Sequence, residues 1–265
     1  MSTREARKAG IVTPPADDAA FARWLAERAG ERLLALRAEQ GFADPARLRA
    51  LGDQQAHDLL VTALKEYRPA DAVLSEEGVR DDPRRLAAPR VWIVDPLDGT
   101  REFGEPGRTD WAVHVALWQR GAGLVAGAVA LPAQQRVLAT DRPPPRPGPA
   151  GGSGAIRLTV SRSRAPALVA AVAERVGAEL VPLGSAGAKI AAVVTGEADA
   201  YLHAGGFYEW DSAAPVAVAR ATELHTSRID GSTLEYNQAD PRLPDLLVCR
   251  RDLAGPLLTA IQECR

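Results

Sequence analysis

Residues 91–100 read Val-Trp-Ile-Val-Asp-Pro-Leu-Asp-Gly-Thr, an apolar run followed by two carboxylates, a glycine and a hydroxyl. The run from Val91 to Val94 lacks the alternation of a half-exposed strand, so it predicts a strand buried on both faces. Pro96 has no N–H to donate, and Gly99 can adopt a backbone conformation closed to other residues. We therefore expect the chain to leave the sheet as a tight turn over residues 95–100.

The two carboxylates of this turn, Asp95 and Asp98, should point into one small space. Two carboxylates at so short a distance raise each other's pKa unless a cation lies between them, so the turn favours a metal site. The N–H groups of Gly99 and Thr100, if they open a helical turn, would face the same space and favour an anion such as phosphate. Taken alone, the motif also fits an ordinary surface turn.

Length and composition limit the number of domains and the classes of function. The 265 residues are 46% hydrophobic, enough to bury a full core in one large domain or two modest ones. The net charge of −2 gives no electrostatic footprint for nucleic acid or an anionic membrane. Cys249 and Cys264 form no disulfide framework or zinc pattern, which predicts a reducing, cytoplasmic location. The sequence shows no secretory signal and no stretch near the ~20 apolar residues of a membrane span.

Apolar spacing predicts the order of the elements in the first half of the chain. Asp17 or Asp18 can cap a helix that runs to about Gln40. A second helix over 52–67, a strand over 71–74 and a hairpin of strands over 111–118 and 124–131 follow. Residues 141–154 contain five prolines and four glycines. They predict a linker between an N-terminal α+β half, 1–150, and a C-terminal α/β half, 151–265.

The second half alternates strands and helices. We expect strands over 156–161, 180–183, 200–203 and 246–249, and helices over 166–176, 187–196, from 210 onward and over 253–264. This alternation is typical of an α/β fold.

Acidic residues recur where predicted strands end or helices begin: Asp53, Glu76 with Glu77, Asp95 with Asp98, and Asp211. Because ligands gather outside the carboxyl ends of strands in α/β sheets, we expect these side chains to converge. A carboxylate cluster without Cys or His suits Mg²⁺, with Mn²⁺ as a possible substitute. Two such ions ~3.5–4 Å apart would clamp a phosphoryl group and activate water. Asp211 alone would merit no more than a role as a helix cap.

These motifs, in this order, resemble those of the Mg²⁺-dependent, lithium-sensitive phosphomonoesterases of the inositol monophosphatase superfamily; the last of them is Trp210-Asp-Ser-Ala-Ala214. The resemblance implies a layered α/β/α/β/α sandwich, two or three Mg²⁺ ions, inhibition by Li⁺ and a possible homodimer. It also implies that Thr100 and Asp53 orient the attacking water. The implied metal ligands are Glu76, Asp95, the carbonyl of Leu97, Asp98 and Asp211.

Other segments are similar to the 3'(2'),5'-bisphosphate nucleotidase branch of that superfamily, the CysQ type. Arg101-Glu-Phe103 matches its Lys/Arg-Glu-Phe, and Ser161-Arg-Ser163 matches its Ser-Arg-Ser-His, with Arg164 in place of His. Gly184-Ser185 followed by Lys189 is similar to its Gly-Ser-x-x-Lys, with one extra residue. These similarities, together with the N–H groups of the 95–100 turn that could bind phosphate, imply a substrate site. Its residues are Gly99, Thr100, Ser161, Arg162, Ser185 and Lys189.

The resemblance implies that the chain hydrolyses the 3'-phosphate of 3'-phosphoadenosine 5'-phosphate, a small-molecule phosphomonoester, to AMP and phosphate, with a link to sulfate assimilation. Arg162 and Lys189 are suited to the second phosphate, and solvated surface cations are the alternative for both. A broader inositol monophosphatase or fructose-1,6-bisphosphatase activity is the first alternative function. A non-catalytic regulatory protein with the same fold is the second.

Overall fold

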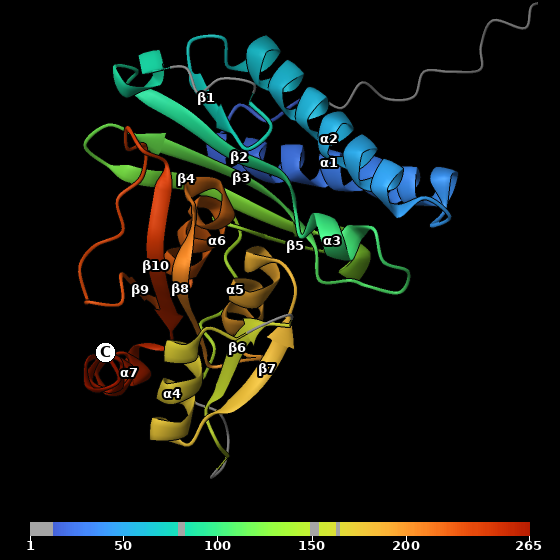
Figure 1. Cartoon of the computed structure of the whole chain (residues 1–265). Helices are drawn as coiled ribbons and strands as arrows, with labels where there is room; N and C mark the ends of the chain where they lie inside the picture. The colour runs from blue at the N-terminus through green and yellow to red at the C-terminus, as the bar shows by residue number, and fades with distance from the viewer. Residues whose placement is uncertain (1–12, 79–82, 149–153, 163–164) are drawn as a thin grey trace, which may run out of the picture.

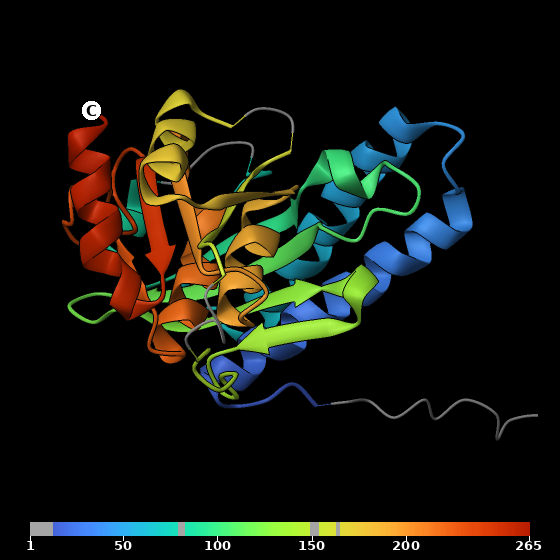
Figure 2. The ribbon, with the colours of Figure 1, turned by 90° about the horizontal axis from the view of Figure 1, so that it is seen from below.

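Two five-stranded sheets and three pairs of helices alternate in five layers (Figure 1). The computed structural model describes residues 13–78, 83–148, 154–162 and 165–265. From one outer layer to the other, the helix pairs are α1 (Asp18–Gln40) with α2 (Pro45–Tyr67), α5 (Ala186–Val194) with α6 (Glu209–Ala221), and α4 (Ala167–Val176) with α7 (Arg251–Glu263). Figure 2 shows α4 and α7 at one end of the molecule and α1 and α2 at the other. The predicted α/β/α/β/α layering is confirmed.

The first sheet has the order β1-β2-β3-β4-β5, with β1 parallel to β2 and the other neighbours antiparallel. Its strands are β1 (Ala72–Ser75), β2 (Arg90–Asp98), β3 (Ala112–Gln119), β4 (Gly123–Leu131) and β5 (Arg136–Ala139). In β2, Val91 and Ile93 pack toward α5 and α6, whereas Trp92 and Val94 pack toward α1 and α2. The prediction that this strand is buried on both faces is confirmed.

The end of β2 differs from the prediction. Asp95 and Asp98 still pair with β3, opposite His114 and Ala112, so the sheet continues four residues beyond Val94. One extra residue on β2 makes a bulge at this point, which tolerates a proline because the ladder bond is interrupted there. The chain turns only at Gly99, whose φ of 85° favours glycine, and enters the single-turn helix α3 (Thr100–Phe103).

The start of α2 also differs from the prediction. The helix begins at Pro45 and not near residue 52, because the Asp44 side chain accepts a hydrogen bond from the N–H of Arg47 at 3.0 Å. Asp53 therefore lies well inside α2 and not near its start. Gly52 allows α2 to approach α3, since a Cβ there would lie 2.7 Å from Cε1 of Phe103.

The second sheet has the order β7-β6-β8-β10-β9, in which β6, β7 and β8 are parallel and β10 and β9 are antiparallel additions. Its strands are β6 (Arg157–Ser161), β7 (Glu179–Leu183), β8 (Ala200–Tyr208), β9 (His225–Ser227) and β10 (Arg242–Cys249). Every predicted strand and helix of this half is present, with β8 and β10 longer than expected. The prediction missed β5 and β9, because strands of four and three residues carry little periodicity.

One core cluster spans the junction of the two sheets. It contains Ile93 of β2, Ile190 of α5, Val216 of α6 and Val248 of β10. The division into halves at residue 150 stays a prediction. The described part of the proline-rich segment, 141–148 and 154, lies between β5 and β6 without a helix or strand of its own. Among the described residues, no helix is both long and apolar enough to cross a membrane.

Candidate active site

Three of the predicted metal ligands meet where the first sheet abuts α6. Asp95 and Asp98 lie at the end of β2, and Asp211 lies in the first turn of α6. Each offers a carboxylate oxygen, and these oxygens lie within 4.8 Å of one another. Asp95 and Asp98 are buried, so bulk water cannot screen the repulsion. An all-oxygen donor set of this kind fits a hard divalent cation such as Mg²⁺.

The charges in this cluster disfavour ionisation. Burial, with the charges of Glu76 and Asp98, raises the pKa of Asp95 well above its ordinary range. Burial and the charge of Asp98 raise the pKa of Asp211 to about 6. Glu76 follows β1 at the solvent-facing edge of the cluster, and partial loss of hydration raises its pKa to about 7, against an opposing interaction with Asp95. A cation at this place would relieve the repulsion in all three.

Asp98 behaves differently from its neighbours. Burial would raise its pKa, but the nearby imidazole of His114 and backbone donors hold it below its ordinary value. Nε2 of His114 lies 3.2 Å from Oδ2 of Asp98, and Nδ1 lies 3.0 Å from the carbonyl oxygen of Trp210. The N–H groups of Ala186 and Gly187, at the start of α5, donate to Asp98 at 3.2 and 2.6 Å. Asp98 is therefore the carboxylate in the cluster that stays ionised most readily.

Thr100 and Asp53 form a polar pair beside the cluster. Oγ1 of Thr100 lies 3.3 Å from Oδ1 of Asp53 and 3.1 Å from the carbonyl oxygen of Leu97. The N–H of Leu97 in turn donates to Oδ1 of Asp95 at 3.0 Å, so backbone contacts connect the pair to the acidic cluster. Burial and the charge of Glu77 raise the pKa of Asp53 to about 6. A hydroxyl held in this way can orient a water molecule.

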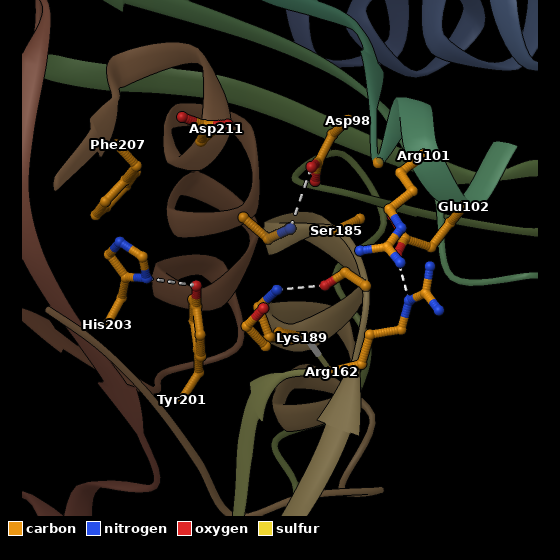
Figure 3. Close-up of a pocket in the computed structure, with 14 residues that line it drawn as sticks. Asp98, Arg101, Glu102, Arg162, Ser185, Lys189, Tyr201, His203, Phe207 and Asp211 are labelled. Carbon is orange, nitrogen blue, oxygen red and sulfur yellow. Dashed lines mark hydrogen bonds and ion pairs between the residues drawn. The ribbon is translucent and has the colours of Figure 1, made fainter. Parts of the chain in front are cut away.

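A pocket of about 310 Å³ opens beside the cluster, with Asp98 and Asp211 in its wall (Figure 3). One side is aromatic, with the ring centroids of His203 and Phe207 4.7 Å apart. The opposite side carries Arg101, Glu102 and Arg162 (Figure 3). Of the six predicted substrate residues, Thr100 is not among those that line this pocket; the other five are Gly99, Ser161, Arg162, Ser185 and Lys189.

The two predicted phosphate-binding cations have partners in the protein. Lys189 is buried, its Nζ donates to the carbonyl of Gly184 and lies 5.4 Å from the ring centroid of Tyr201. Burial lowers the pKa of Lys189, against the opposing charges of Asp98 and Glu102. Arg162 donates from Nε to Glu102 at 2.6 Å. Neither side chain is a freely solvated cation.

Glycines shape the wall between these groups. A Cβ on Gly99 would lie 2.9 Å from Cβ of Ser185, whose Oγ caps α5 by accepting from the N–H of Ala188 at 2.8 Å. A Cβ on Gly184 would collide with Glu102, and one on Gly187 with His114. Ser163 and Arg164, which belong to one of the sequence motifs, lie outside the described residues.

Comparison with known proteins agrees with this geometry. The model of the inositol monophosphatase family matches residues 20–264. The chain belongs to the inositol monophosphatase family. The 3'-phosphoadenosine 5'-phosphate phosphatase of Mycobacterium leprae (strain TN) is 52% identical over 255 residues, which cover 93% of this chain and 94% of the relative. The 3'(2'),5'-bisphosphate nucleotidase CysQ of Escherichia coli (strain K12) is 29% identical over 192 residues, covering 69% and 77%.

Solved structures of inositol monophosphatase family members have the same fold. The crystal structure of CysQ from Bacteroides thetaiotaomicron superposes with a TM-score of 0.73 at 28% identity, covering 86% of this chain and 94% of that one. The family resemblance inferred from the sequence motifs is confirmed.

The sequence motifs of this inositol monophosphatase family chain did not predict a role for several residues of the site. The motif match included Arg101 but gave it no role, and it placed no function on Tyr201, His203 or Phe207. His114, to which the sequence motifs assign no role, also contacts Asp98 directly. The register between β2 and β3 brings His114 to the acidic cluster, because His114 pairs with Asp95 across the two strands. No local pattern in residues 112–119 signals that contact.

Proposed function

We propose that this chain is a Mg²⁺-dependent phosphomonoesterase that hydrolyses the 3'-phosphate of 3'-phosphoadenosine 5'-phosphate to AMP and phosphate. The observation that carries the proposal is the group of Asp95, Asp98 and Asp211 within 4.8 Å, beside a pocket with cationic side chains. The named activity of the M. leprae relative, similar over nearly the whole chain, supports the choice of substrate.

The residues have distinct parts in this reaction. Glu76, Asp95, Asp98, Asp211 and the carbonyl of Leu97 would hold Mg²⁺. When bound, Mg²⁺ neutralises charge on the phosphoryl group and lowers the pKa of a bound water.

Asp53 and the carbonyl of Leu97 compete for the single proton of the Thr100 hydroxyl, so a lone pair of Oγ1 is left to accept from the attacking water. Catalysis is then mainly positioning and charge stabilisation.

The two walls of the pocket suit a nucleotide that carries a second phosphate. Phe207 and His203 offer apolar ring surface for a base, and Arg101, Arg162 and Lys189 offer positive charge for the non-reacting phosphate. The volume of about 310 Å³ lies in the range of small-molecule pockets. The cytoplasmic location, the link to sulfate assimilation, the inhibition by Li⁺ and the possible homodimer are further parts of the proposal.

Phosphate release from 3'-phosphoadenosine 5'-phosphate tests the proposed reaction. We expect turnover with Mg²⁺ and its loss on adding EDTA or Li⁺. We also expect loss in Asp95→Asn and retention in Asp58→Asn, which alters an exposed residue of α2. Phosphate release at the same rate without a divalent metal ion would contradict the proposed mechanism. No release from any phosphomonoester would favour the non-catalytic regulatory alternative.

A substrate panel tests the first alternative, a broader phosphatase. We expect kcat/KM to be highest for the bisphosphate nucleotide, ahead of inositol 1-phosphate and fructose 1,6-bisphosphate. Equal values for the three would show that the second phosphate and the base add no transition-state binding.

A further inference from the structure

One carboxylate oxygen holds two guanidinium groups at the rim of the pocket. Oε1 of Glu105 accepts from Nη2 of Arg162 at 2.6 Å and from Nε of Arg101 at 3.3 Å. Both arginines line the pocket and lie together on one side of it (Figure 3). The carboxylate thus binds donors of two residues that line the pocket, and Glu105 itself stands outside the lining.

The two glutamates that contact Arg162 are not equivalent. The Glu102 side chain is 8% exposed and is wedged against the backbone at Gly184, so it is fixed. The Glu105 side chain is 35% exposed and follows α3 in a loop. An exposed ion pair is weak because water solvates both partners almost as well. Of the two carboxylates, Glu105 is the one that can move away.

The charges at this rim sum to zero. Arg101 and Arg162 supply two positive charges, and Glu102 and Glu105 supply two negative ones. A phosphate that approached this arrangement would meet no net positive charge at the rim. If Glu105 withdraws, the two guanidinium groups present a net positive charge and planar donors suited to phosphate oxygens.

We infer that Glu105 is an internal anion that competes with the substrate's second phosphate for Arg101 and Arg162 and is displaced by it. This inference rests on the proposed function. Displacement by a phosphate dianion replaces one weak pair with several charge-assisted hydrogen bonds, whereas a nucleotide lacking that phosphate leaves Glu105 in place. Glu105 is therefore a specificity-determining residue, because only substrates with a second anionic group compete with it.

The variant Glu105→Gln tests the inference, because it keeps the shape and removes the charge. The measured quantity is KM for 3'-phosphoadenosine 5'-phosphate divided by KM for adenosine 3'-phosphate. Since exposed ion pairs contribute little, we expect this ratio to fall about two- to fivefold. Thermal unfolding establishes that the variant folds. An unchanged ratio would overturn the inference, and a raised ratio would show that Glu105 instead holds Arg162 in its binding position.

A matched control removes a comparable pair elsewhere. Glu263→Gln disrupts the exposed pair with Arg175 at 2.6 Å, between α7 and α4, and should leave the ratio unchanged. Calorimetry separates this inference from the proposed function. If neither nucleotide were hydrolysed, the proposed function would fail, and the ratio of the two Kd values would still decide the role of Glu105, with the same expected decrease.

Discussion

Neutralising one carboxylate of the acidic cluster should stabilise the metal-free protein. In Asp211→Asn, the amide oxygen can still accept the hydrogen bond that the N–H of Tyr208 donates to Asp211 at 2.6 Å. Burial and Asp98 raise the pKa of Asp211 from 3.8 to about 6, a shift of about two pH units. Ionised Asp211 thus costs the folded state ~3 kcal/mol, or ~6 °C in Tm for a chain of this length.

The pH dependence of the difference in stability shows whether the ionisation of Asp211 causes it. The folded-state pKa is raised, so the favourable contribution of protonated Asp211 is complete below about pH 4 and is lost as the pH rises through about 6. In EDTA, thermal melts followed by circular dichroism should show equal stability of variant and wild type near pH 4, and a more stable variant above pH 7. Excess Mg²⁺ should stabilise the wild type more than the variant. This prediction would be refuted if the variant were less stable than wild type at pH 8 in EDTA. It would also be refuted if the difference in Tm between variant and wild type did not change with pH. Asp58→Asn is the control.

Two further substitutions test the close contacts of the site. Gly187→Ala places a Cβ against the imidazole of His114, so we expect urea unfolding to show a loss of ~1–3 kcal/mol, whereas Gly148→Ala, with open space around it, should be neutral. Thr100→Val keeps the side-chain shape and removes the hydroxyl that contacts Asp53, so kcat for phosphate release should fall ~10²-fold or more with little change in KM. A change confined to KM would assign Thr100 to substrate binding alone.

Local sequence patterns predicted the parts of the fold that depend on local physics. The unbroken apolar run of β2 corresponds to a strand whose side chains enter two different cores. The Asp17 side chain caps α1 as expected, accepting from the N–H of Ala20 at 2.8 Å. The start of α2 was missed because the apolar stripe becomes regular only after residue 52, although Asp44-Pro45 carries a recognisable cap signal.

Contacts between distant residues could not be predicted in the same way. Arg162 meets Glu102 and Glu105 across 60 and 57 positions of sequence, and no periodicity encodes which charged side chains pair at that distance. The motif match gave Arg162 as a candidate phosphate ligand, with a solvated cation as the alternative, and did not indicate that two carboxylates bind it. The same limit applied to His114, whose contact with Asp98 depends on strand register.

The acidic cluster and the substrate pocket share one structural element, α5. Asp98 stays ionised because two N–H groups at the start of α5 and His114 stabilise its charge, while burial and like charges oppose ionisation of Asp95 and Asp211. A cation bound at this place would offset the repulsion among the carboxylates and so favour the ionised forms of Asp95 and Asp211. The helix whose N–H groups hold Asp98 also carries Lys189, so one element fixes both a carboxylate of the acidic cluster and a cation of the pocket wall.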